Sequence, residues 1–150
     1  MKKKKIIIRV IIGILIVAII YSILWFALVF RKYKSYASNM KRGLAITSYY
    51  DNSNKDIMYN VKYPDFPYLT GNLAVSIDDD KESLIIWPSI FGETEYGLQL
   101  TDDNKEMASI TVDAKGKALE NDSNTKELIS KNQDKVNELF DLANKRWKGL

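Results

Sequence analysis

The longest apolar run of the chain covers residues 10–30, and its twenty-one residues include no charged side chain. Basic residues lie on both sides of it, at positions 2–5, 9, 31, 32 and 34. A helix rises about 1.5 Å per residue, so a run of this length extends roughly 30 Å, which is the thickness of the hydrocarbon layer of a bilayer. The run therefore predicts a single transmembrane helix. A cleaved signal peptide is disfavoured, because its apolar region spans only about 7–15 residues.

After this run the polarity pattern changes to a period of two. Apolar and polar residues alternate over 56–63, 72–78, 95–100 and 107–112, which is typical of strands with one buried face. Residues 83–87 form a continuous apolar run that favours a central strand, and residues 44–50 form a weaker candidate. Short polar links separate these segments, so successive strands are expected to pair as hairpins. The pattern predicts an antiparallel meander of five to seven strands.

The last part of the chain has helical periodicity. Asn124 suits the N-cap of a helix, and Glu127 could complete a capping box. An apolar stripe follows at helical spacing, and we expect it to pack on the sheet: Ile129, Val136, Phe140, Ala143 and Trp147. The predicted fold class is α+β, with one amphipathic helix after the meander. As a topological analogy only, this order also fits a PH-like barrel; a single four- or five-stranded sheet with the helix across one face fits nearly as well.

These patterns divide the chain into four regions. They are a cytoplasmic basic N-terminus at 1–9, a transmembrane anchor at 10–30, a basic juxtamembrane linker at 31–42, and an extracytoplasmic α+β domain at 43–150. Trp25, Phe26 and Tyr33 would then lie near the outer membrane interface as an aromatic belt.

The distribution of charge favours one orientation of the anchor. Before Gly43 the chain has 10 basic and no acidic residues, whereas from Gly43 onward it has 12 basic and 19 acidic residues, a net charge of −7. Basic residues flank both ends of the anchor, so counting them does not decide the topology. A short basic N-terminus is easily retained in the cytoplasm, and the acidic region has no basic excess to hinder its export. We expect a single-pass protein of the cell membrane with its N-terminus cytoplasmic and its domain extracellular.

The composition excludes several kinds of chemistry. The chain has no cysteine and no histidine, so a thiol nucleophile, a thiolate metal site and a Ser-His-Asp triad are all excluded. A small exported domain without disulfides is compatible with a bacterial cell envelope. The acidic domain disfavours nucleic acid as a partner, because neutralising phosphates needs a basic face. No motif for a small-molecule cofactor is present.

Two groups of carboxylates were weighed as chemical sites. One comprises the acidic turns with Asp78, Asp79, Asp80, Glu82, Asp102 and Asp103, which could bind a hard cation such as calcium. Their spacing lacks the EF-hand pattern, so solvated hairpin turns explain them better. The other is Glu93 with Glu95, which would point the same way from a strand and could perform acid–base work. Exposed charges at a strand end explain this pair better, and no catalytic or metal-binding residue is assigned.

Aromatic residues interleaved with prolines form the candidate partner-binding site: Tyr63, Phe66, Tyr68, Trp87 and Phe91. Aromatic side chains on stiffened loops lose little entropy on contact and are favoured in binding surfaces, although core packing competes with this interpretation. The sequence thus favours a membrane-anchored, non-enzymatic accessory or binding module of the bacterial envelope. Its expected partners are the lipid bilayer and another envelope protein. The alternative is a small envelope hydrolase that uses carboxylates alone.

Overall fold

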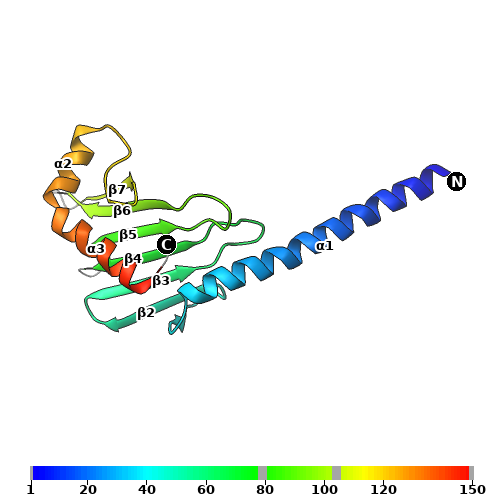
Figure 1. Cartoon of the computed structure of the whole chain (residues 1–150), viewed down its shortest axis with the longest axis horizontal. Coiled ribbons are helices and arrows are strands. Elements are labelled where there is room, and N and C mark those ends of the chain that lie inside the picture. The colour runs from blue at the N-terminus through cyan, green and yellow to red at the C-terminus, as the bar shows by residue number, and fades with distance from the viewer. Residues whose placement is uncertain (1, 78–80, 103–105, 149–150) are drawn as a thin grey trace.

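The structure is a computed structural model that describes residues 2–77, 81–102 and 106–148. A long N-terminal helix leads into a sheet, and two shorter helices complete the chain (Figure 1). The elements are α1 (Lys2–Tyr36), β1 (Lys41–Arg42), β2 (Ser48–Asn54), β3 (Ile57–Lys62), β4 (Asn72–Ile77), β5 (Glu82–Trp87), β6 (Glu95–Thr101), β7 (Met107–Val112), α2 (Ser123–Lys131) and α3 (Gln133–Arg146).

The seven strands form one antiparallel sheet in the order in which they occur along the chain. On the buried face, apolar residues of neighbouring strands lie opposite each other. Val75 of β4, for example, pairs with Leu84 of β5. The predicted α+β meander is therefore confirmed. Of the two architectures left open by the sequence, the structure has the single sheet, but with seven strands rather than four or five, and with β1 and β7 at its edges. The weak strand expected at 44–50 begins only at Ser48, and a register shift between Asp51 and Asn54 interrupts its pairing with β3.

The C-terminal helical region differs from the prediction at its start and in its continuity. Asp122, not Asn124, is the N-cap, and its carboxylate accepts a hydrogen bond of 2.8 Å from the backbone N–H of Thr125. The region also forms two helices rather than one, because the backbone leaves helical geometry at Asn132. The apolar stripe packs on the sheet as expected. Ile129, Val136, Ala143 and Trp147 are buried, and Phe140 is half-buried against Tyr96.

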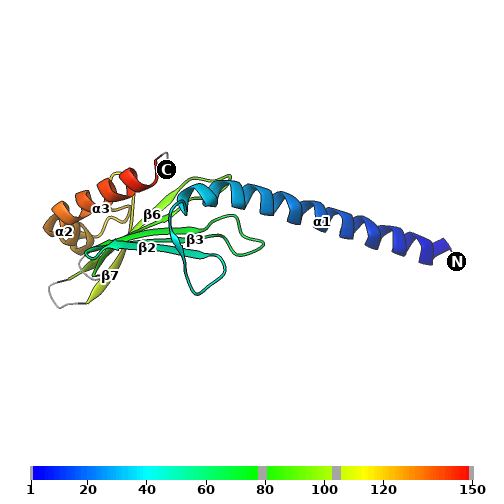
Figure 2. The ribbon, with the colours of Figure 1, turned by 90° about the horizontal axis from the view of Figure 1, so that it is seen from below.

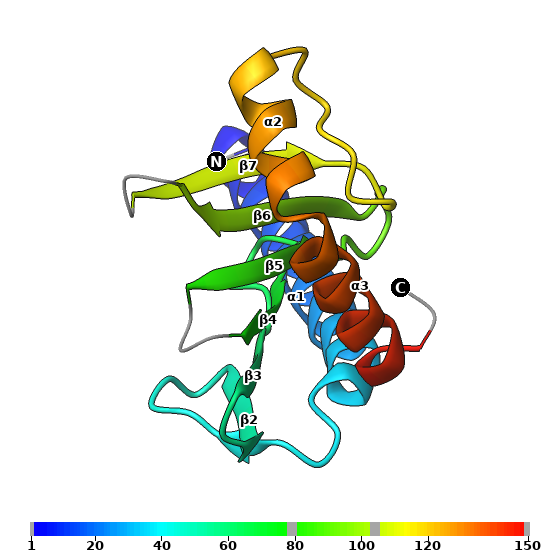
Figure 3. The ribbon, with the colours of Figure 1, turned by 90° about the vertical axis from the view of Figure 1, so that its left-hand side faces the viewer.

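The last turns of α1 and the whole of α3 cover the same face of the sheet (Figures 2 and 3). Four α1 residues at intervals of four are buried there: Trp25, Val29, Tyr33 and Ala37 just beyond the helix end. This spacing places them on one side of the helix, above the apolar side chains of the central strands. No helix of the described chain covers the opposite face of the sheet.

The position of α1 changes how three aromatic residues are interpreted. Trp25 and Tyr33, which the sequence placed in an aromatic belt, instead belong to the core of the domain. Phe26 is exposed, and its ring packs edge-on against that of Trp25 with 5.0 Å between the ring centres. Residues 31–36, assigned to a linker, continue the helix without interruption. The folded unit therefore includes the second half of the apolar run, because burying Trp25 and Val29 removes apolar surface from water.

The first half of α1 extends away from the domain (Figure 1). Apolar side chains are exposed all round it between Ile6 and Ile20. Within the described chain, this is the one helix long and apolar enough to cross a membrane.

Side chains at the end of α3 attach that helix to the rest of the fold. The Arg146 guanidinium lies 3.1 Å from the Asp51 carboxylate and 5.3 Å from the centre of the Tyr59 ring. Trp147 donates a hydrogen bond of 3.2 Å from Nε1 to the Tyr36 carbonyl, where α1 ends. Hydrogen bonds from Ser53, followed by the charge of Arg146, hold the pKa of the Asp51 carboxyl below its usual value. The two helices are thus joined to each other as well as to the sheet.

The burial of α1 predicts different results for two valines of the same helix. Val29 is 1% exposed and Val17 is 67% exposed. We expect Val29→Ala to lower the free energy of unfolding by about 2 kcal/mol, because it removes two buried methyl groups and leaves a cavity. That loss would lower the Tm of the detergent-solubilised protein by roughly 6–10 °C. The matched Val17→Ala variant should melt like the wild type, and equal melting of both variants would contradict the docking of α1.

Candidate functional site

The five candidate aromatic residues occupy three different environments. Tyr63 is buried, with ring centres 5.6 Å from Tyr33 and 5.2 Å from Tyr49. Burial, reinforced by Tyr49, raises the pKa of Tyr63 to about 12, so its hydroxyl stays neutral in the core. Trp87 is half-buried on the open face of the sheet. The remaining three, Phe66, Tyr68 and Phe91, are 52%, 70% and 75% exposed. The sequence therefore identified one core residue and four surface-accessible ones.

The loops that carry the exposed aromatics lie side by side at one end of the sheet. Residues 63–71 connect β3 to β4, and residues 88–94 connect β5 to β6. A bridge pairs Thr70 with Ser89, and the backbone N–H of Ile90 donates a bond of 3.1 Å to the Leu69 carbonyl. These backbone bonds hold the two loops together at the end of the sheet nearest the free part of α1 (Figure 1).

Polar side chains of α1 fix both loops from the helix side. Trp25 donates from Nε1 to the Tyr68 carbonyl at 2.6 Å, and Tyr21 donates to the Pro67 carbonyl at 2.9 Å. In the second loop, Lys32 donates to the Ser89 carbonyl at 2.6 Å. Loop carbonyls outside the strand ladder need such donors when they are withdrawn from water. The arrangement explains why hydroxyl, indole and ammonium groups occur near the end of the apolar run.

Tyr33 connects the two loops. Its hydroxyl donates a hydrogen bond to the buried Pro88 carbonyl and accepts one of 2.6 Å from the backbone N–H of Gly71. Gly71 is required there, because a Cβ would lie only 2.4 Å from Cε1 of the Tyr33 ring. Sequence reasoning missed this role of Tyr33. Trp25, Val29, Tyr33 and Ala37 share one helix face, but beside a run that is apolar on every side this spacing does not by itself mark a contact.

A groove of about 580 Å³ lies beside the second loop. Its lining includes Trp87, Glu93, Glu95, Thr111 and Asp113. The Trp87 ring lies over Gly97, where a Cβ would approach its Cη2 to 2.8 Å. A glycine in the neighbouring strand thus allows the indole to lie flat against the sheet. The groove combines an aromatic surface with carboxylates and hydroxyls.

The described carboxylates of the two candidate groups lie in different environments. Glu93 and Glu95 both line the groove, and both are exposed to solvent. Glu82 is buried and pairs with Lys135 of α3 at 2.7 Å, so it helps to join helix and sheet. Asp102 accepts a bond of 2.8 Å from the backbone N–H of Glu106 in the β6–β7 turn.

The rest of the acidic cluster, Asp78, Asp79, Asp80 and Asp103, lies outside the described residues. Within residues 2–77, 81–102 and 106–148, no group of three or more Asp and Glu residues could hold a metal ion. Of the described members of this cluster, Glu82 takes part in an ion pair and Asp102 in a turn.

Comparisons with known proteins give no relative. No protein-family description, no curated protein and no solved structure matches the chain.

The contact between Trp87 and Gly97 makes the geometry of the groove testable. The chain has three tryptophans, so labelling with 5-fluorotryptophan should give three fluorine resonances. We expect Gly97→Ala to shift the Trp87 resonance, because the new methyl displaces the ring, and to leave those of Trp25 and Trp147 in place. Gly92→Ala is the matched control in the same groove, since its Cβ would meet only the Ser89 side chain, at 3.1 Å from Oγ. An unmoved Trp87 resonance in Gly97→Ala would contradict the described contact.

Proposed function

We propose that this protein is a single-pass membrane protein that holds a non-enzymatic binding module at the surface of a bacterial cell envelope. One observation carries the proposal. Helix α1 is free and apolar as far as Ile20, and its next four turns are part of the core of the domain. An apolar helix half outside the fold needs a second apolar environment, and a bilayer supplies it.

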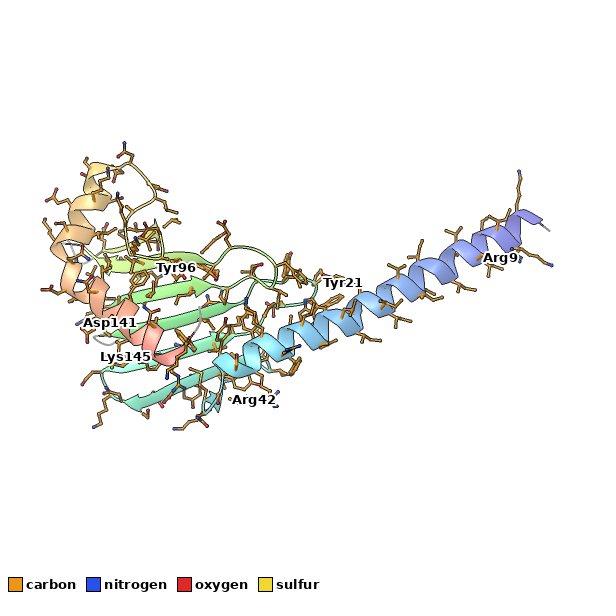
Figure 4. All side chains as sticks on the ribbon, in the orientation of Figure 1. Arg9, Tyr21, Arg42, Tyr96, Asp141 and Lys145 are labelled. Atoms are coloured by element: carbon orange, nitrogen blue, oxygen red, sulfur yellow. The ribbon has the colours of Figure 1, made fainter. Side chains whose placement is uncertain are left out.

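The orientation follows from the charge distribution. Lys3, Lys4, Lys5 and Arg9 lie at the free end of α1, where Figure 4 shows Arg9. The domain at the other end is acidic from Gly43 onward. A short basic segment is readily kept on the cytoplasmic side, so the domain lies outside the cell.

The open face of the sheet is the proposed contact surface for another envelope protein. Its groove contains one large, half-buried indole, and tryptophan is enriched among residues that dominate binding energy. A catalytic role has weaker support, because the chain lacks histidine and cysteine and the two groove glutamates are solvated. The binding module is therefore the function that the geometry supports best.

The orientation can be measured directly because the chain contains no cysteine. Single cysteines at Lys3→Cys and Lys145→Cys place one thiol at each end, and both native side chains are exposed. In intact cells a membrane-impermeant maleimide should label position 145 and reach position 3 only after the membrane is permeabilised. The opposite pattern would reverse the proposed topology.

Binding at the groove can be tested by photo-crosslinking in native membranes. A benzoylphenylalanine at Thr94, which lines the groove, should give a discrete adduct larger than the protein alone. The same residue at Asp141, exposed on α3 (Figure 4), is the control and should give none. The adduct from position 94 should also weaken with Trp87→Ala. Equal adducts from both positions, or none from position 94, would contradict the proposed contact surface.

A further inference from the structure

Three exposed aromatic side chains lie at the end of the domain where α1 leaves it. They are Phe66 and Tyr68 in the first loop and Phe91 in the second, and all three are more than half exposed. Phe91 does not line the groove, and the Phe66 ring contacts Trp25 of α1 at 5.3 Å between centres. Figure 4 shows Tyr21, which donates to the Pro67 carbonyl, at this same tip. These contacts fix the aromatic loops beside the part of α1 that contains Tyr21 and Trp25.

The number of apolar residues in α1 determines how close the aromatic loops lie to the hydrocarbon layer of a bilayer. The hydrocarbon layer requires about 20 helical residues, with a range of roughly 17–25. If the apolar stretch begins at Ile6, even the shortest span extends to Ser22, and a span of about 20 residues extends to Trp25. Tyr21 therefore lies inside the apolar layer or at its boundary. Tilting the helix would require still more residues to cross, which would bring the loops closer to the layer.

The exposed side chains of the docked part of α1 agree with this position. Ile23, Leu24, Phe26 and Phe30 remain about half exposed or more, although they lie beyond the point at which docking begins. Arg31 follows, about 9 Å further along the axis than Trp25, and its side chain is exposed. Apolar residues followed by a basic residue match the order of hydrocarbon and headgroup in a membrane.

We propose that Phe66, Tyr68 and Phe91 enter the headgroup region of the bilayer and hold the domain directly against the membrane surface. The occupant of this aromatic patch is lipid, because the patch is continuous with the proposed membrane span and lies at the height of its outer end. Aromatic rings are favoured at that depth, and a tyrosine hydroxyl can remain hydrated there. The inference rests on the proposed membrane span.

The test is spin labelling of the full chain in nanodiscs that each hold one copy in phosphatidylethanolamine and phosphatidylglycerol. Single cysteines are introduced by Tyr68→Cys and Phe91→Cys in the patch, at exposed positions where the fold does not depend on the side chain. Ile16→Cys reports the membrane span, and Met107→Cys reports an exposed site at the opposite end of the sheet, in the β6–β7 hairpin. Collision of each label with oxygen, which dissolves in lipid, is compared with collision with a water-soluble nickel chelate.

We expect the oxygen-to-nickel ratio at positions 68 and 91 to exceed that at position 107 several-fold and to lie between those of positions 107 and 16. If positions 68 and 91 match position 107 while position 16 is lipid-exposed, the anchor stands but the patch faces water, which overturns the inference. If position 16 is itself exposed to water, the proposed membrane span fails first. Because each disc holds one copy and no other protein, neither a partner nor a second copy can produce the expected result.

Discussion

The structure depends on the packing of the last turns of α1 against the sheet. Tyr33 is at the centre of this contact, because its ring is fully buried and its hydroxyl bonds to both aromatic loops. A buried hydroxyl that lost these partners would cost about 1–3 kcal/mol, a large part of the net stability of a small domain. The contact therefore does more than attach a helix: it completes the core and sets the shape of the loops.

This packing also gives the domain a fixed direction relative to its helix. A flexible linker would allow the sheet to sample many orientations at the membrane. Here the helix continues through Tyr36, and the end of α3 bonds to Tyr36 and Ser38 through Trp147 and Arg146. The groove beside Trp87 consequently keeps one orientation relative to α1.

The two faces of the sheet differ in the side chains that they carry. The covered face contains large apolar residues such as Leu73 and Leu84, which α1 and α3 remove from water. The open face contains smaller and more polar residues, and Ser83 there donates from its hydroxyl to the Gln99 side-chain oxygen at 2.9 Å. Such a face needs no covering helix, because its polar side chains are satisfied by one another or by water.

The sequence by itself determined the elements whose pattern is local. Alternation of period two located β3, β4, β6 and β7, and helical spacing located the stripe from Ile129 to Trp147, because one buried face leaves its period in the chain. A continuous apolar run located β5. The tertiary structure alone decided which side of α1 faces the domain, because a run that is apolar on every side carries no period that marks a contact. It also separated buried Tyr63 from exposed Phe91, because the burial of an aromatic residue depends on neighbours distant in sequence, such as Tyr33 and Tyr49.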